Sequence, residues 1–192
     1  MENGYVDDLF FALRHTVFRN ANGGTEEYND GISLLLDMFS KHKENGSKLF
    51  FIGNGGSAAI ASHMTADFMK NGGMRTVDMY GSSVATCISN DYGYDHIFSK
   101  QLEFMARTGD LLVAISSSGN SENIVNGIMA GKKQGAEVIT LTGFNRDNKC
   151  GKMGDFNVYV PCYEYGKVET IHVLILQQIV DLILERDGVW GI

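Results

Sequence analysis

The feature that most constrains the fold is a regular alternation of short apolar runs with longer amphipathic segments, from Lys48 to the end of the chain. The apolar or β-branched runs have the length of single strands and cover residues 49–52, 75–79, 111–115, 137–142 and 156–160. The segments with helical spacing cover residues 58–71, 96–106, 121–134 and 168–186. This order predicts a doubly wound α/β fold, in which five parallel strands are flanked by helices on both faces.

The first 46 residues precede this alternation and show two apolar stripes with helical spacing. The first stripe includes Val17 and Phe18, and the second begins at Ile32, with a break at residues 22–24. No Pro-rich linker or low-complexity stretch divides the chain, so we expect one domain over residues 1–192, with residues 1–46 as a helical extension packed on it. The extension and the apolar last helix are expected to contact another copy of the chain.

Charge and composition exclude several classes of partner. The formal net charge is −7 and the pI is about 5.1, which gives no general attraction to nucleic acid or to an anionic membrane. The start of the chain lacks a secretion signal, no apolar run reaches the roughly 20 residues that a membrane span needs, and the three cysteines are far apart. We therefore expect a cytoplasmic protein with no membrane partner and no nucleic-acid partner.

Two turns that follow predicted strands have an unusual composition. Residues 53–57 read Gly-Asn-Gly-Gly-Ser, and residues 116–121 read Ser-Ser-Ser-Gly-Asn-Ser. Both turns open helices, where free backbone N–H groups and the helix dipole attract anions. Either turn alone is equally well explained by a sharp corner with a capping serine. Together they predict a cradle for a phosphate dianion, because neighbouring strands of a parallel sheet bring such turns to one edge.

Nucleotide ligands fit these turns less well than a phosphorylated sugar does. Neither turn has the Gly-Lys-Ser/Thr ending of a P-loop. Gly53, Gly55 and Ala58 satisfy a permissive dinucleotide pattern, and Asp78 lies where a ribose-binding acid is expected. A dinucleotide gives no reason for the serine cluster, however, so we expect a phosphosugar and no nucleotide cofactor.

Four blocks along the chain resemble the sugar isomerase (SIS) domain family, and more narrowly its phosphoheptose isomerases. They are the two turns above, Asn90-Asp91-Tyr92-Gly93 and Leu141-Thr142-Gly143, and the resemblance extends over about residues 5–186. It implies a cytoplasmic homotetramer that converts sedoheptulose 7-phosphate to a heptose 7-phosphate for cell-surface glycans such as lipopolysaccharide or capsule. The implied substrate-binding residues are Asn54, Gly55, Gly56, Ser57, Asn90, Asp91, Ser116, Ser117, Ser118 and Ser121.

The catalytic and zinc positions of the family fall on His63, Asp67, Glu169 and Gln177, where typical members have His, Glu, Gln and His. Only His63 is unchanged. Asp67 retains a shorter carboxylate, whereas Gln177 cannot exchange protons. Glu169 and His172 are the residues that can compensate, so the expected catalytic set is Asp67, Glu169, His172 and Gln177. His63, Asp67, Glu169 and Gln177 also form the expected metal set, for zinc or another divalent metal, although its oxygen-rich donors leave a metal-free site equally open.

Two other functions remain open at this point. One is a non-catalytic phosphosugar-binding regulator, or an adaptor like the replication-initiator-associating members of the family, which the loss of histidine at position 177 favours. The other is a different sugar-phosphate isomerase of the same superfamily, since pocket depth sets the length of the accepted sugar. The set of polar residues in an otherwise apolar framework favours an enzyme.

Overall fold

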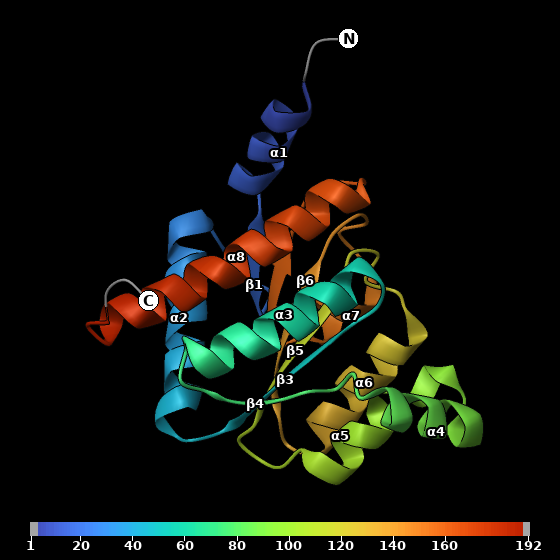
Figure 1. The fold of residues 1–192 in the computed structure, drawn as a ribbon. Helices are drawn as coiled ribbons and strands as arrows, with labels where there is room; N and C mark the ends of the chain where they lie inside the picture. The colour runs from blue at the N-terminus through green and yellow to red at the C-terminus, as the bar shows by residue number, and fades with distance from the viewer. Residues whose placement is uncertain (1–3, 190–192) are drawn as a thin grey trace.

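A computed structural model describes residues 4–189 and contains one mixed sheet of seven strands in the order β2-β1-β7-β6-β5-β3-β4 (Figure 1). The five strands from β7 to β4 are parallel, as predicted. Their bounds are Lys48–Gly53 for β3, Arg75–Val77 for β4, Leu111–Ser116 for β5, Glu137–Thr142 for β6 and Phe156–Tyr159 for β7. The predicted doubly wound α/β core is therefore confirmed.

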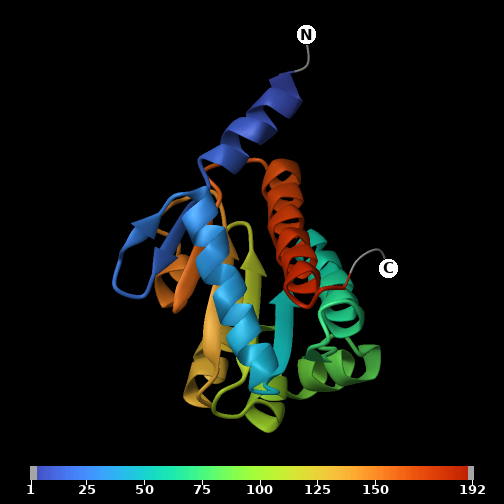
Figure 2. The ribbon, with the colours of Figure 1, turned by 90° about the vertical axis from the view of Figure 1, so that its left-hand side faces the viewer.

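Helices cover both faces of this sheet (Figures 1 and 2). On one face lie α2 (Tyr28–Glu44), α3 (Gly56–Lys70) and α8 (Tyr165–Arg186), which share an apolar core with alternate strand residues. The opposite face carries α5 (Ser99–Met105) and α6 (Glu122–Lys133) over a second core. The shorter helices are α4 (Ser82–Tyr92), the single 3₁₀ turn η1 (Tyr94–His96) and α7 (Lys149–Met153).

The central strands read as continuous apolar runs because both of their faces are buried. Along β3, Phe51 joins the core under α2, α3 and α8, whereas Phe50 and Ile52 join the core under α5 and α6. Every residue of β5 is buried. Successive side chains of a strand point to opposite faces, so these two strands hold the helical layers together and fix the edge at which their turns emerge.

The N-terminal region differs from the predicted helical extension. Val17–Asn20 forms β1, which pairs antiparallel with β7, and Thr25–Glu26 forms β2 at the edge of the sheet. The apolar pair Val17 and Phe18 therefore belongs to a strand, in which Phe18 is fully buried, and not to the first helix. The Asn-Gly-Gly break is the turn of a hairpin, a signal present in the sequence. Two short antiparallel strands thus extend the predicted five.

The helical predictions need smaller corrections. Residues 82–92 form α4, which the sequence analysis did not predict, and α5 is shorter than the predicted helix over residues 96–106. The last helix begins at Tyr165 and buries one side against the rest of the chain, so part of its apolar surface is covered within the protein. Within residues 4–189, no helix is long and apolar enough to cross a membrane.

The first helix, α1 (Gly4–Arg14), projects beyond the body of the protein (Figures 1 and 2). Its only buried residue is Ala12, while Tyr5, Val6, Phe10 and Phe11 are each at least half exposed. Lys167, at the start of α8, anchors α1 through an ion pair with Asp8. An apolar helix surface of this kind is typical of contacts between protein chains.

Candidate functional site: a serine-lined pocket and a nearby acid–base cluster

The two unusual turns come together in one pocket. Gly53, the last residue of β3, is paired with Ile115 of the neighbouring parallel strand β5, so the turns that follow these strands leave the sheet side by side. The residues that line the pocket come from both turns and from the start of α8: Asn54, Ser57, Ile115, Ser116, Ser117, Ser118, Ser121, Tyr165 and Glu169. Gly55 and Gly56 lie in the first turn between two lining residues. The two predicted turns therefore line one pocket, and its binding of a phosphate stays a prediction.

The helices that begin at this pocket have no side-chain caps. Gly55 precedes α3 with a φ of 54°, a left-handed conformation that glycine adopts without strain. Ser121 precedes α6, and its hydroxyl makes no capping hydrogen bond. The first N–H groups of a helix have no partner inside the helix, so both helix starts offer donors and positive dipole ends to a bound anion.

The serine hydroxyls of the second turn differ in their hydrogen bonds. Ser116 Oγ accepts a hydrogen bond from the Gly119 N–H at 3.1 Å. Ser117 is 3 % exposed, and its Oγ has no hydrogen-bond partner within the described part of the chain. A buried hydroxyl without a partner is costly, and the pocket that Ser117 lines is where a ligand oxygen would satisfy it.

The charges of the lining residues indicate how the pocket would bind an anion. No lysine or arginine is among the lining residues, and Glu169 is the one lining residue with an ionisable acid. An anion bound here is held by N–H groups, hydroxyls and helix dipoles, not by ion pairs. This arrangement suits a phosphate group that is attached to a larger, polar molecule.

Glu169 lies on the first turns of α8 and leans over the start of α3. A Cβ atom added to Gly56 would overlap the Glu169 carboxylate, so only glycine at this position allows the side chain to approach. Partial burial raises the pKa of Glu169 above that of an ordinary glutamate. The group therefore retains a proton to higher pH than an exposed carboxylate does, which is useful for proton exchange.

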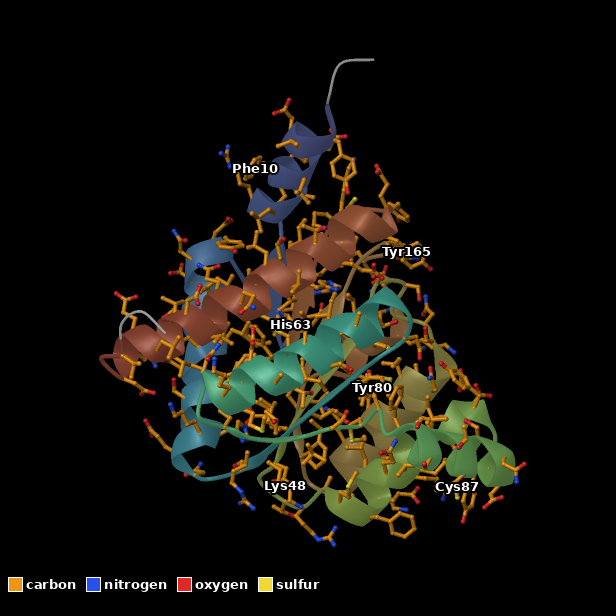
Figure 3. All side chains as sticks on the ribbon, in the orientation of Figure 1. Phe10, Lys48, His63, Tyr80, Cys87 and Tyr165 are labelled. Carbon is orange, nitrogen blue, oxygen red and sulfur yellow. The ribbon has the colours of Figure 1, made fainter. Side chains whose placement is uncertain are left out.

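A second polar cluster joins α3 to α8 farther along both helices. Gln177 Nε2 donates to Asp67 Oδ2 at 2.6 Å and lies 3.1 Å from His63 Nε2. His63 Nε2 is also 3.3 Å from Asp67 Oδ2 across one helical turn. Because the amide nitrogen only donates, we assign His63 as the tautomer with its proton on Nδ1. Figure 3 shows His63 between α3 and α8, at some distance from Tyr165.

Three of the four predicted metal ligands, His63, Asp67 and Gln177, lie within hydrogen-bond distance of one another. With the amide oriented as here, the Gln177 NH₂ group faces His63 Nε2 and Asp67 Oδ2, and exchanging its N and O presents a third lone pair at the same point. Glu169, the fourth predicted ligand, is at the pocket beside Gly56. Among residues 4–189, no three His, Cys, Asp or Glu side chains are grouped as a metal site requires. The metal expected from the resemblance stays a prediction, and no chemistry below depends on it.

His172 does not line the pocket, which argues against its expected role in proton transfer. It is fully buried, and its Nε2–H donates to the Thr142 carbonyl at 3.3 Å. Burial lowers the pKa of His172 to about 4, and its Nδ1 has no partner in the described structure. A buried, neutral imidazole can orient the end of β6, but it cannot exchange protons with a ligand that it does not contact.

Asn90 and Asp91 are likewise not brought to the pocket. Both are exposed at the end of α4, where the Asn90 amide donates to Asp91 Oδ1 at 2.8 Å. The nearest link is Tyr94, just beyond α4, whose hydroxyl donates to Asn54 Oδ1 at 2.9 Å. The predicted substrate role of Asn90 and Asp91 stays a prediction.

Two residues at the site were not identified from the sequence. Asn123, in the first turn of α6, exchanges side-chain hydrogen bonds with Asn54. Tyr165, the first residue of α8, is among the residues that line the pocket. Neither lies in a glycine- or serine-rich turn, so local composition held no signal for them. Their roles follow from the packing of segments that are distant in sequence.

The fold and the pocket are those of a phosphosugar-binding SIS domain, and a family model of the SIS domain matches residues 15–143. Phosphoheptose isomerase of Sulfurimonas denitrificans is 35 % identical to this chain, over 93 % of either protein. The chain belongs to the phosphoheptose isomerase family of SIS domain proteins.

Solved structures of the same family have the same fold. The structure of phosphoheptose isomerase from Francisella tularensis superposes with a TM-score of 0.82 at 26 % identity, covering 95 % of this chain and 96 % of that one. Phosphoheptose isomerase GmhA from Neisseria gonorrhoeae gives a TM-score of 0.74 at 34 % identity, covering 79 % of this chain and 84 % of that one. The similarity thus spans the sheet, both phosphate turns and the helices that meet at the pocket.

Proposed function

We propose that the protein is an aldose–ketose isomerase that converts sedoheptulose 7-phosphate to a heptose 7-phosphate, a precursor for cell-surface glycans. The observation that supports this most directly is the convergence of two uncapped helix N-termini and five serines on one pocket. The phosphate of the substrate is held there without a cation. The names of the relatives favour this substrate among sugar phosphates.

Distances along α3 support a seven-carbon substrate. Ser57 lines the pocket and His63 lies six residues farther along the same helix, which corresponds to about 9 Å at 1.5 Å per residue. In an extended heptulose 7-phosphate, seven bonds separate C2 from phosphorus, which is roughly 8 Å at about 1.2 Å per bond. A phosphate in the serine pocket therefore brings C1 and C2 close to the cluster of His63, Asp67 and Gln177.

The proposed chemistry uses the neighbouring side chains of Asp67 and His63. Asp67, oriented by the Gln177 amide, takes the proton from C1 as an enediol forms and returns it to C2. His63, whose Nε2 lies 3.3 Å from Asp67 Oδ2, gives a proton to the oxygen at C2 and receives one from the hydroxyl at C1. Each proton removed is returned, so the reaction needs no external acid, base or oxidant. Glu169 lies eight residues before Gln177 on α8, about 12 Å at 1.5 Å per residue, so its protonated carboxyl group donates to the part of the ligand near the phosphate.

The test is isomerisation in deuterated water, followed by NMR. Wild-type protein with sedoheptulose 7-phosphate should form the aldose and incorporate deuterium at C2. Asp67→Asn should slow turnover by at least about 10²-fold, the usual contribution of a general acid–base group, whereas Glu169→Gln should mainly raise KM. Asp181→Asn, an exposed position on α8, is the matched control and should keep the wild-type rate. Absence of turnover in wild-type protein, with and without Zn²⁺, would exclude the isomerase.

One observation favours a second function, a phosphosugar-binding regulator without catalysis. Gln177 is hydrogen-bonded to both possible proton carriers on α3, His63 and Asp67, and cannot itself carry a proton. A regulator should bind sedoheptulose 7-phosphate in a calorimetric titration yet give neither product nor deuterium exchange. Binding without exchange would therefore replace the isomerase by this second function.

We also propose a cytoplasmic homotetramer. The exposed apolar side chains of α1, among them Phe10 and Phe11, support contacts between copies (Figure 3 labels Phe10). Light scattering after size exclusion should give four times the monomer mass of 21.1 kDa. Substitution of Phe10 and Phe11 by serine should shift that mass downward, and a wild-type monomer would contradict the proposal.

A further inference from the structure

An aromatic unit stands beside the serine pocket. Tyr165 lines the pocket at the start of α8, one turn before Glu169, and 60 % of its surface is exposed. Phe144 supports the Tyr165 ring edge-on, with 4.8 Å between ring centroids. On its other side Phe144 stacks with Tyr163 at 5.9 Å, and Tyr163 does not line the pocket. Only Tyr165 of the three rings is therefore presented to a ligand.

The backbone of Phe144 is held in an unusual conformation. Its φ is 55°, and within residues 4–189 it is the one non-glycine residue with a positive φ. Such a conformation in a bulky residue persists only when its surroundings enforce it, and it is often found at functional sites. Here the Phe144 N–H donates to the Cys162 carbonyl at 2.9 Å, and the Phe144 carbonyl accepts from the Tyr159 hydroxyl at 2.8 Å.

The aromatic unit is tied directly to the serine turn. Gly143, which precedes Phe144, donates its N–H to the Ser117 carbonyl at 2.9 Å. The position of the Phe144 ring, and through it that of Tyr165, is therefore fixed relative to the pocket. When the phosphate of a ligand contacts Ser117, the Tyr165 ring lies at a fixed position beside that ligand.

The chemistry of an aromatic ring limits what part of the ligand it contacts. The face of a tyrosine ring carries partial negative charge, which disfavours a phosphate dianion and favours C–H groups. Apolar aromatic walls with a few polar groups are common where proteins bind small molecules. Glu169, four residues later on the same helix, provides a polar partner for hydroxyl groups of the same ligand.

We propose that Tyr165 is a specificity-determining residue that packs against the C–H groups of the sugar chain next to the phosphate. This inference rests on the proposed binding of a phosphosugar in the serine pocket. It separates two parts of the site: the helix N-termini bind the phosphate, and the Tyr165 ring selects ligands in which a carbon chain follows the phosphate.

The test compares two probes by isothermal titration calorimetry. The affinity for inorganic phosphate measures the contribution of the helix N-termini alone. The affinity for a heptitol 7-phosphate, which has no carbonyl and cannot react, measures the contributions of the helix N-termini and of the Tyr165 ring. Tyr165→Ala should weaken heptitol 7-phosphate about tenfold and leave the affinity for inorganic phosphate within twofold. Tyr165→Phe should bind both probes like the wild type. Tyr163→Ala, which removes the ring on the far side of Phe144, is the matched control and should also bind like the wild type.

Other results would overturn the inference. Equal weakening of both probes by Tyr165→Ala would mean that the ring supports the phosphate turns, and unchanged binding of both would mean that it contacts no sugar. A changed oligomeric mass with unchanged heptitol 7-phosphate affinity would assign the ring to a contact between copies. If the wild type binds neither probe, the proposed phosphosugar function fails as well, whereas unchanged binding in Tyr165→Ala removes only this inference.

Discussion

Asn54 and Asn123 exchange two side-chain hydrogen bonds, each amide donating to the oxygen of the other at 2.8 Å. Asn54 belongs to the turn before α3, and Asn123 is 2 % exposed in the first turn of α6. The pair therefore fixes the separation of the two helix N-termini that meet at the pocket. Tyr94 adds a third hydrogen bond by donating to Asn54 Oδ1.

The first prediction concerns this amide pair. Asn123→Ala should leave the Asn54 amide without its partner, which costs about 1–3 kcal/mol of stability for a buried polar group. It should also weaken inorganic phosphate binding by about tenfold, since a loss of 1.4 kcal/mol in binding corresponds to that factor. Urea unfolding and calorimetry measure the two effects. Asn126→Ala, at a half-buried position one turn later that does not line the serine pocket, is the control, and unchanged phosphate affinity in Asn123→Ala would contradict a positioning role.

The second prediction concerns the pH dependence of the isomerase. Burial raises the pKa of Glu169, so this carboxyl group keeps its proton to higher pH than an ordinary glutamate. Protonated Glu169 donates to the ligand beside the phosphate and ionised Glu169 repels the phosphate dianion, so kcat/KM should fall as the pH rises through its pKa. Glu169→Gln should abolish this limb of the profile as well as lower the rate. A profile with the same limb in the variant would assign that ionisation to another group.

The third prediction tests the close approach of Gly56 to Glu169. A methyl group at position 56 would overlap the Glu169 carboxylate, the flexible end of a long side chain. Gly56→Ala should therefore fold normally and displace the carboxyl group from the ligand beside the phosphate, lowering kcat/KM by about tenfold, the factor that corresponds to 1.4 kcal/mol. Gly81→Ala, at the start of α4, where an added Cβ makes only an ordinary contact with Val84, should retain full activity. Normal kcat/KM in Gly56→Ala would show that the position of Glu169 is unimportant.

The fourth prediction concerns stability and the buried His172. Its pKa is about 4 in the folded protein, against 6.5 for an ordinary histidine, so the unfolded chain binds a proton first as the pH falls. The free energy of unfolding should therefore decrease between about pH 6.5 and pH 4, by roughly 2 kcal/mol from this group between pH 7.5 and pH 5.

His172→Gln, which retains a donor for the Thr142 carbonyl, removes the titrating ring. Urea unfolding gives the free energy of unfolding at pH 7.5 and at pH 5. The decrease between these two pH values should be smaller in the variant than in the wild type by roughly 2 kcal/mol. His15→Gln, at an exposed position in the described structure, is the matched control and should change nothing. Equal pH dependence in wild type and His172→Gln would contradict the neutral, buried state.

The sequence was most informative where local pattern determines structure. The apolar runs of β3 and β5 predict buried strands because both faces of a central strand are covered, and their bounds differ from the prediction by a residue or less at each end. Glycine and serine in the turns that follow predict an anion cradle at two helix starts, whereas the absence of side-chain caps there is seen only in the structure. Local composition was less informative for Val17–Asn20. These four residues suit either a helix or an edge strand, and their pairing with β7 makes them a strand.

The sequence by itself therefore determined the α/β order, the five parallel strands and the two turns that offer N–H groups and hydroxyls. The tertiary structure alone decided that Asn123 joins these turns, that Tyr165 stands beside them and that His172 is fully buried against Thr142. The reason is physical. Backbone preference and hydrophobic periodicity act between residues close in the chain, whereas pocket geometry depends on how α3, α6 and α8 pack on one sheet.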